Sequence, residues 1–300
     1  MFDPNCETLF EKKNVGFSHR SDKFKTILIE LENIFKTKFG LPEDSIVLFI
    51  TGSGTLVNEI VLSSMKPHSI FLNVDDEKEK FGIRLKNQAL KYEVQTKASL
   101  ISGQVQYETS ISKEYRICSS TIFVDAISSF PFYKVPSWVE CFTTVGGKQL
   151  GSYAGIGIIV IQNRDFLERL RIINESRRTS YLNIFEHINS CYYHETPYTP
   201  SICLVYDLLR KISAFDIEKH RKKIFDRRDS LEYIIPKEFI IGVGPVLSLR
   251  KDLFISCHIP VIYDLYETKE LFQIFLWSGS NKQYEQFGKD IKNHLKRRNS

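Results

Sequence analysis

Three short apolar runs between residues 121 and 161 constrain the possible folds of this chain more than any other feature. The runs are Thr121–Val124, Cys141–Val145 and Gly155–Ile161. Runs of this length, rich in β-branched and aromatic residues, are typical of strands buried on both faces of a sheet. Asp125 directly follows the first run, and Lys148 follows the second after two glycines. Because ligands collect at the strand ends of α/β sheets, we expect this carboxylate and this amine to face each other.

A carboxylate and a lysine in this arrangement suit the chemistry of pyridoxal 5'-phosphate (PLP). Lys148 would form a Schiff base with the aldehyde of PLP, and Asp125 would keep the pyridine nitrogen protonated so that the ring accepts electrons. Gly146 and Gly147 would leave room for the cofactor beside the backbone. The same residues are also compatible with a helix-capping aspartate and a solvated loop lysine, so other motifs must separate the two interpretations.

A small, glycine-bearing turn, Thr51–Thr55, follows the apolar run Ile46–Ile50 and precedes a helical pattern. The backbone N–H groups of such a turn, its hydroxyls and the positive end of the helix together favour an anion. Ser53, Gly54 and Thr55 are therefore candidate phosphate ligands. An ordinary strand-to-helix turn with a threonine cap has the same sequence pattern.

Composition and charge exclude several classes of function. The 41 basic and 36 acidic residues leave a net charge of only +5. Part of the excess lies in the tail 289–298, where it complements a helix dipole, so nucleic-acid binding is not expected. The six cysteines form no CxxC pattern and the seven histidines are scattered, which predicts reduced thiols in a cytoplasmic protein and no metal site. The sequence shows neither a bilayer-spanning apolar run nor a signal peptide at residues 1–10, so no membrane association is expected.

The pattern of elements predicts two domains. Ser21 is a candidate N-cap for a helix that Gly40 closes. The charged run 216–228 predicts a helix with a solvated face. From about residue 234 the pattern changes to short strands (239–243, 246–249, 272–276) and a last helix, 284–295. We therefore predict an N-terminal extension at 1–14, a large domain at 15–230 and a small C-terminal α/β domain at 231–300.

Seven motifs occur in a fixed order along the chain. They are SHRS (18–21), TGSGT…E (51–59), FGxR (81–84), ETS (108–110), VDAISSF (124–130), GGKQL (146–150) and YYHETP (192–197). In this order they resemble the class V branch of the fold type I PLP-dependent aminotransferases, and most closely the 2-aminoethylphosphonate–pyruvate transaminases. The resemblance implies an α/β fold with a mainly parallel seven-stranded sheet between helices and a small α/β domain behind it.

The same resemblance assigns roles to the candidate residues. Lys148 would be the Schiff-base lysine and proton shuttle, and Asp125 the partner of the pyridine nitrogen. Ser53, Gly54 and Thr55 would bind the phosphate. These roles imply an aminotransferase that moves an amino group from a small amine or amino acid to a keto acid or aldehyde.

Four further residues receive roles from the resemblance alone. Phe81 would stack on the ring, although a phenylalanine before glycine is more often core packing. Thr109, after a possible strand at 105–107, would contact the ring hydroxyl. Tyr193 and Thr196 would reach the phosphate in the neighbouring subunit, which implies a homodimer with shared active sites.

Three departures from the family pattern keep other functions open. Residues 1–14 match nothing in relatives, and the segment between Arg84 and Asp125 is shorter than usual. Gln273 stands where relatives carry an arginine that binds the substrate carboxylate, and a neutral amide cannot replace that charge. Candidates for a replacement cation are Arg20, Arg84, Arg178 and Arg250. A PLP-dependent lyase or decarboxylase, and a shortened non-catalytic relative that acts as a binding partner, are therefore the alternatives to a transaminase.

Overall fold

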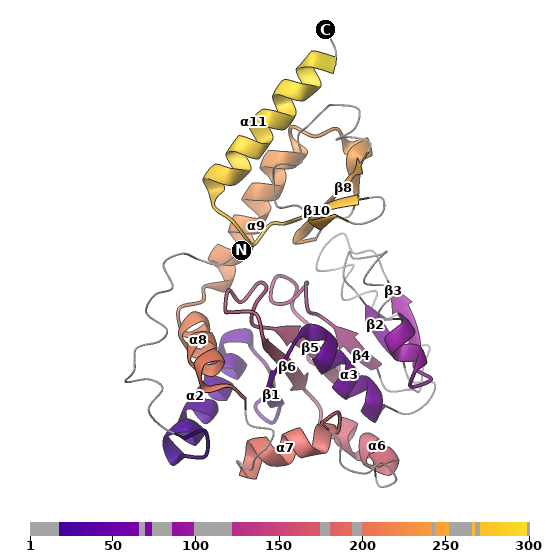
Figure 1. Cartoon of the computed structure of the whole chain (residues 1–300), viewed down its shortest axis with the longest axis vertical. Helices are drawn as coiled ribbons and strands as arrows, with labels where there is room; N and C mark the ends of the chain where they lie inside the picture. Colours follow the sequence, from indigo (N-terminus) through magenta and orange to yellow (C-terminus); the bar gives the residue numbers. More distant parts are fainter. Residues whose placement is uncertain are drawn as a thin grey trace.

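The computed structural model describes residues 18–65, 70–73, 86–98, 122–174, 181–193, 200–241, 244–251, 266–267 and 271–298. In Figure 1 these residues form a large α/β body with a smaller α/β unit above it. Each of the two parts contains one sheet. None of the helices in the described part of the chain has the length and apolar character needed to cross a membrane.

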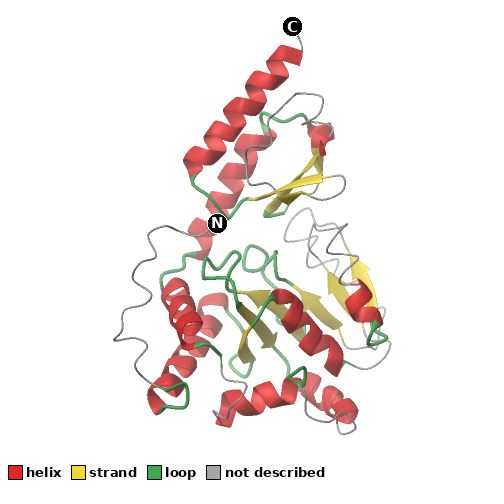
Figure 2. Ribbon diagram, viewed as in Figure 1, coloured by secondary structure: helices red, strands yellow, loops and turns green. Residues whose placement is uncertain are grey.

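The large sheet contains six strands within the described residues. They are β1 (Ile46–Thr51), β2 (Ile70–Asn73), β3 (Gln95–Ala98), β4 (Ile122–Asp125), β5 (Cys141–Val145) and β6 (Ile156–Ile161). Their spatial order is β1-β6-β5-β4-β2-β3. β6 runs antiparallel to both of its neighbours, whereas β5, β4, β2 and β3 pair in parallel. This arrangement confirms the predicted mainly parallel sheet (Figure 2).

The count of six differs from the predicted seven strands. β2 hydrogen-bonds directly to β4, with Ile70 opposite Ile122, so no strand lies between them. The possible strand at 105–107 lies outside the described residues. The shortened segment before Asp125 is consistent with this direct pairing, because fewer residues are present to form a further strand and its crossover.

Helices cover both faces of the large sheet. They are α2 (Asp22–Phe39), α3 (Gly54–Ser64), α6 (Asp165–Asn174), α7 (Ile184–Tyr193) and α8 (Ile202–Ser213). Side chains alternate between the two faces along β1: Val47 and Phe49 pack with α2 and α8, whereas Leu48 and Ile50 pack with α3, α6 and α7. The sheet is therefore buried on both sides, as its continuous apolar runs predict.

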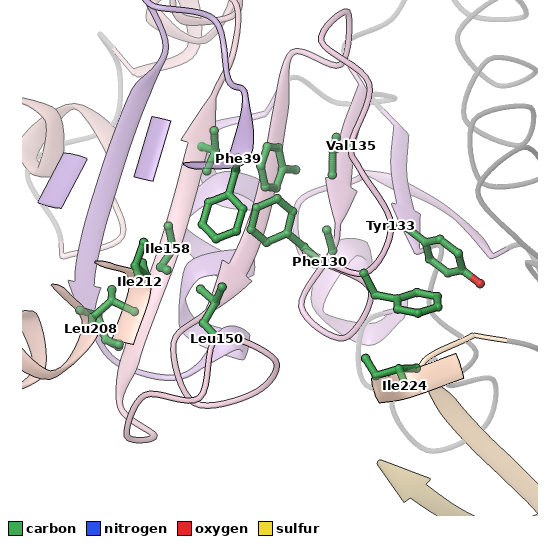
Figure 3. Packing of buried hydrophobic residues seen from close by; sticks show 14 of the residues in the cluster. Phe39, Phe130, Tyr133, Val135, Leu150, Ile158, Leu208, Ile212 and Ile224 are labelled. Carbon is green, nitrogen blue, oxygen red and sulfur yellow. The ribbon is translucent and has the colours of Figure 1, made fainter. Parts of the chain in front are cut away.

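The caps of α2 follow the sequence prediction. The side chain of Ser21 accepts a hydrogen bond from the backbone N–H of Phe24, and Gly40 ends the helix at φ 61°. Aromatic side chains of this helix belong to a cluster in which the Phe39 and Phe130 rings meet edge to face with centroids 4.9 Å apart. Figure 3 shows Phe39, Phe130, Leu150 and Ile158 in this packed layer. The core thus supports the loops that follow β4 and β5.

The upper unit contains the second sheet and two long helices. Its elements are α9 (Ile217–Glu232), η2 (Lys237–Phe239), β7 (Ile240–Ile241), β8 (Val246–Arg250), β9 (Tyr266–Glu267), β10 (Leu271–Phe275) and α11 (Asn281–Arg298). The strand order is β7-β8-β10-β9, and every pair is antiparallel. The predicted strands 246–249 and 272–276 match β8 and β10. α11 begins three residues before the predicted 284.

Helix α9 extends from the large body into the upper unit (Figure 1). A Cβ on Gly288 of α11 would lie 2.9 Å from Ile234, so the glycine allows α11 to pack closely beside the end of α9. The predicted solvated face of α9 is wrong at Arg227 and Arg228, each 5% exposed. Arg227 donates to the backbone carbonyls of Leu276 and Ser278 at 2.7 Å, so its charge binds the turn before α11. The domain boundary at 230/231 stays a proposal and falls within α9.

Candidate active site

Asp125 is the last residue of β4 and lies at the edge of the sheet formed by the carboxyl ends of β4 and β5. Its register partner on β5 is Thr143, and its side chain is only 3% exposed. The backbone N–H of Ile127 donates to Oδ1 at 2.9 Å, and the amide of Asn58 donates to Oδ2 at 2.9 Å. Each carboxylate oxygen therefore receives a directed donor, which offsets the desolvation of the buried group.

Lys148 lies in the turn that follows β5. The turn is closed by a hydrogen bond from the Gly151 N–H to the carbonyl of Lys148, at 3.1 Å. The ammonium of Lys148 donates to the hydroxyl of Ser128. Ser128 is three residues after Asp125, so one short turn carries both the carboxylate and the hydroxyl that binds the lysine. The predicted pair thus lies at one edge of the sheet.

The two glycines before Lys148 are explained by packing within the chain. A Cβ on Gly147 would lie 2.7 Å from the Cα of Ala154, and one on Gly146 would lie 2.5 Å from the Ile156 side chain. Contacts under 3.0 Å to backbone require the chain to shift. Glycine is therefore needed for the loop to fold back on itself, independently of any ligand.

The Thr51–Thr55 turn lies against the same edge. Ser53, and not a threonine, is the N-cap of α3: its hydroxyl accepts from the N–H of Leu56 at 3.3 Å. A Cβ on Gly54 would lie 2.5 Å from Ile127 and 3.2 Å from Val145. The start of α3 is thus packed onto the ends of β4 and β5, and the turn, Asp125 and Lys148 come from three elements that converge at this edge.

A second set of contacts holds the lysine turn from outside. Gln149, next to Lys148, donates to the Ser128 carbonyl, and its Oε1 accepts from the N–H of Phe132 at 3.2 Å. Nε2 of His220 on α9 lies 3.0 Å from the same oxygen. Burial, and then the nearby charges of Lys223, Arg221 and Arg227, lower the pKa of His220 from 6.5 to about 4. The imidazole is therefore neutral at pH 7 and donates through Nε2.

The far end of this loop is held by a buried carboxylate on α8. Asp207 is 1% exposed, and its Oδ2 accepts from the hydroxyl of Ser152 at 2.7 Å and from the N–H of Tyr153 at 2.9 Å. Arg210 pairs with Oδ1 at 3.4 Å. The lysine turn is thus anchored on both sides by polar groups of the core.

Several predicted site residues cannot be placed. Phe81, Thr109 and Thr196 lie outside the described residues, as do the candidate cations Arg84 and Arg178. Tyr193 is the last residue of α7, and its side chain also lies outside the described part.

The described residues considered for binding the substrate carboxylate are either neutral or exposed to solvent. Arg20 and Arg250 are exposed. Gln273 is 2% exposed and donates to the Ser248 hydroxyl at a long 3.5 Å. Within the described residues, its Oε1 has no hydrogen-bond partner. No group of three or more His, Cys, Asp or Glu side chains suited to a metal ion occurs in the described ranges.

Sequence reasoning missed Asn58, Ser128 and Gln149. Asn58 is a polar residue inside the apolar helical run of α3, and a buried amide in such a position needs partners. That pattern was the available signal for Asn58. Ser128 and Gln149 belong to the VDAISSF and GGKQL motifs, but their roles depend on contacts between loops.

Similarity to solved structures establishes the class of fold. A phosphoserine aminotransferase from Cytophaga hutchinsonii matches with a TM-score of 0.75 and 18% identity, over 95% of this chain and 93% of that chain. An aspartate aminotransferase from Thermus thermophilus matches with 0.70 and 15%, over 95% of each chain. An alanine–glyoxylate aminotransferase from Nostoc sp. matches with 0.68 and 16%, over 95% of this chain and 91% of that one.

No protein-family model and no curated protein sequence matches the chain. At these low sequence identities the structural similarity shows the fold alone. The chain has the α/β architecture of the fold type I PLP-dependent transferases, as the order of motifs predicts.

Proposed function

We propose that this chain is a PLP-dependent aminotransferase of the class V type. The observation that carries the proposal is the turn 125–128, on which Asp125 and the hydroxyl that binds Lys148 are three residues apart. The likeness of the fold to aminotransferases supports the same conclusion.

The chemistry of the residues present fits PLP. An amine, a buried carboxylate and a helix N-terminus with hydroxyls match the aldehyde, ring nitrogen and phosphate of the cofactor. When bound, PLP supplies an electron sink for charge that develops on the substrate. Lys148 would hold the cofactor covalently and move the proton, and Asp125 would hold the proton on the ring nitrogen. Ser53, Gly54 and Thr55 would bind the phosphate.

The remaining cofactor contacts stay part of the proposal. Phe81 would cover the ring and Thr109 would contact its hydroxyl. Tyr193 and Thr196 would complete the phosphate site of a second subunit, which makes a homodimer part of the hypothesis. Sedimentation of the PLP-loaded protein checks it, because a monomer that binds PLP tightly would exclude shared sites.

The proposed substrates are a small amine or amino acid and a keto acid or aldehyde. Solved structures with this fold include a phosphoserine aminotransferase and a pyridoxamine–pyruvate aminotransferase, so the fold serves chemically different donors. The motif likeness to 2-aminoethylphosphonate–pyruvate transaminases supports phosphonate-related amines as one class to test. The free thiols of Cys141 and Cys203 agree with the proposed cytoplasmic location.

Absorbance tests the proposal directly. Purified protein mixed with PLP should develop the visible band of a PLP–lysine linkage, and Lys148→Ala should abolish it. Lys134→Ala is a matched control, because Lys134 lies on the loop after β4 and has no proposed role. If the wild-type protein shows no band at millimolar PLP, the function proposed here is wrong and a non-catalytic relative is the better hypothesis.

A PLP-dependent lyase or decarboxylase is the second candidate. It is supported by Gln273, a neutral side chain paired with Ser248 at the position where relatives bind the substrate carboxylate. An enzyme without that anchor has less need to bind a keto acid for a second half-reaction. Incubation with amine donors separates the two: a transaminase converts the bound cofactor to its pyridoxamine form, and a lyase leaves it as PLP.

A further inference from the structure

Asn58 joins helix α3 to both strands that end at the candidate site. Its side chain is 1% exposed. The amide nitrogen donates to Oδ2 of Asp125 at 2.9 Å, and Thr143 donates through its hydroxyl to the amide oxygen at 2.6 Å. Thr143 is also the register partner of Asp125 across β4 and β5. One buried amide thus bridges two neighbouring side chains of the sheet.

The chemistry of the three groups fixes their orientation. An ionised carboxylate only accepts hydrogen bonds, so the NH₂ group of Asn58 must face Asp125. The amide oxygen then faces Thr143, whose hydroxyl must donate. The protons therefore form one directed chain, from Thr143 through Asn58 to Asp125, and reversing the amide would set two acceptors against each other.

This chain of hydrogen bonds fixes the plane of the Asp125 carboxylate. Oδ1 is fixed by the N–H of Ile127 and Oδ2 by Asn58. Each carboxylate oxygen can accept more than one donor, so a further N–H can still bind beside these two. A carboxylate whose plane is set in advance loses less conformational freedom when it receives a ring N–H.

Asn58 also relates Asp125 to the phosphate turn. Gly54 and Asn58 are four residues apart on α3 and share one face of the helix. Gly54 packs on Ile127, and Asn58 bonds to Asp125. The same helix face therefore sets the spacing between the turn at its start and the carboxylate on β4, which are the two ends between which a rigid cofactor must fit.

We propose that Asn58 is a positioning residue for the cofactor: it orients Asp125 toward the ring nitrogen and keeps it in register with the phosphate turn on α3. The proposal rests on the PLP-dependent function given above. It concerns binding of the ring nitrogen, so it makes a prediction that a general loss of stability would not produce.

The test compares two probes, PLP and the PLP analogue in which carbon replaces the ring nitrogen. Their dissociation constants are measured by absorbance titration of the Lys148-linked band with the wild-type protein and with Asn58→Leu. We expect Asn58→Leu to weaken PLP about tenfold, because the bond that orients Asp125 is lost, and to leave the analogue within about twofold. Equal weakening of both probes, or no weakening of PLP, overturns the proposal.

Two further variants protect this comparison. Thr143→Val keeps the bond between Asn58 and Asp125 but removes the donor that fixes the amide, so it should weaken PLP selectively by a smaller factor, about threefold. If Asn58→Leu does not fold, Thr143→Val decides by the same ratio of the two probes. Ser64→Ala is the matched control, because Ser64 is buried on α3 and bonds to the Ile60 carbonyl away from the site.

Failure of the general function is distinguishable from failure of this proposal. A wild-type protein without a band for PLP would remove the cofactor, and the role of Asn58 with it. A wild-type band combined with unchanged binding in Asn58→Leu would remove the role of Asn58 alone.

Discussion

Two buried amides, Asn58 in the large sheet region and Gln273 in the small sheet, have opposite environments. Asn58 is bonded at both ends, at 2.6 Å and 2.9 Å, and one partner is a carboxylate. Gln273 has one long bond of 3.5 Å to a hydroxyl, and its oxygen has no partner within the described residues. Both are nearly inaccessible to solvent.

The comparison separates the two ends of the proposed active site. The proposed cofactor end has a directed hydrogen-bond network around the buried Asp125, whereas Gln273 is neutral and the described candidate cations Arg20 and Arg250 are exposed. Within the described residues, the Gln273 side chain provides no charge with which to bind an anion at this position. Under the proposed function, the residues assigned to PLP are held by hydrogen bonds, whereas the position assigned to the substrate carboxylate carries a neutral amide.

The largest effect is expected from removing the Asp125 carboxylate, the partner of Asn58. Asp125→Ala leaves the N–H of Ile127 and the amide of Asn58 without their acceptor, at about 1–3 kcal/mol each. It also removes the carboxylate proposed to bind the ring nitrogen, so PLP should bind about 100-fold more weakly. Denaturant unfolding of the apoprotein and absorbance titration with PLP measure the two effects. Unchanged PLP binding would place the ring nitrogen elsewhere.

A smaller effect is expected from His220, on the helix between the two regions. Its pKa is about 4 in the folded protein and 6.5 when exposed, so the unfolded chain binds the proton first as pH falls. The contribution of His220 to the free energy of unfolding is therefore fully present above pH 6.5 and is lost as the pH falls from 6.5 to about 4. The loss is about 2 kcal/mol after discounting for partial exposure. His220→Gln should flatten this loss in unfolding curves measured across that range. An equally steep loss would assign the acid sensitivity to other groups.

The smallest expected effect is the difference in the free energy of unfolding between variants of Asn58 and of Gln273. Asn58→Leu should lower the free energy of unfolding of the apoprotein by about 1–2 kcal/mol, because Asp125 and Thr143 each lose a partner. Gln273→Leu should change it by less than about 0.5 kcal/mol, because a long bond and an unpartnered oxygen disappear together. Denaturant unfolding of both variants measures the difference. Equal losses would mean that the small sheet depends on its amide as much as the large one does.

Local patterns in the sequence were sufficient for much of the fold. Continuous apolar runs predicted β4, β5 and β6, because a strand buried on both faces needs apolar residues on both. The caps at Ser21 and Gly40 were likewise predictable, since they depend on neighbouring residues. The convergence of Asp125 and Lys148 followed from a general property of parallel strand ends.

What the sequence could not supply depends on contacts across elements. The bridge from Asn58 to Asp125 and Thr143 joins residues 67 and 85 positions apart, and no local pattern specifies it. The direct pairing of β2 with β4, which leaves six strands in the described sheet, joins segments that are distant in the sequence and that no local pattern pairs. The charged run 216–228 did not predict the burial of Arg227, because the carbonyls that accept its hydrogen bonds lie in a turn distant in the sequence.

Helix α9 mechanically couples the upper unit to the lysine turn. His220, near the start of α9, lies 3.0 Å from Gln149, and Arg227, about two turns further along, binds the turn before α11. A helix of 16 residues is about 24 Å long and resists bending, so it behaves as a lever rather than a tether. Along the helix axis His220 and Arg227 are about 10 Å apart, so a tilt of about 5° about Arg227 would displace His220 by about 1 Å. A displacement of that size along the bond would lengthen the contact of His220 with Gln149, the residue next to Lys148.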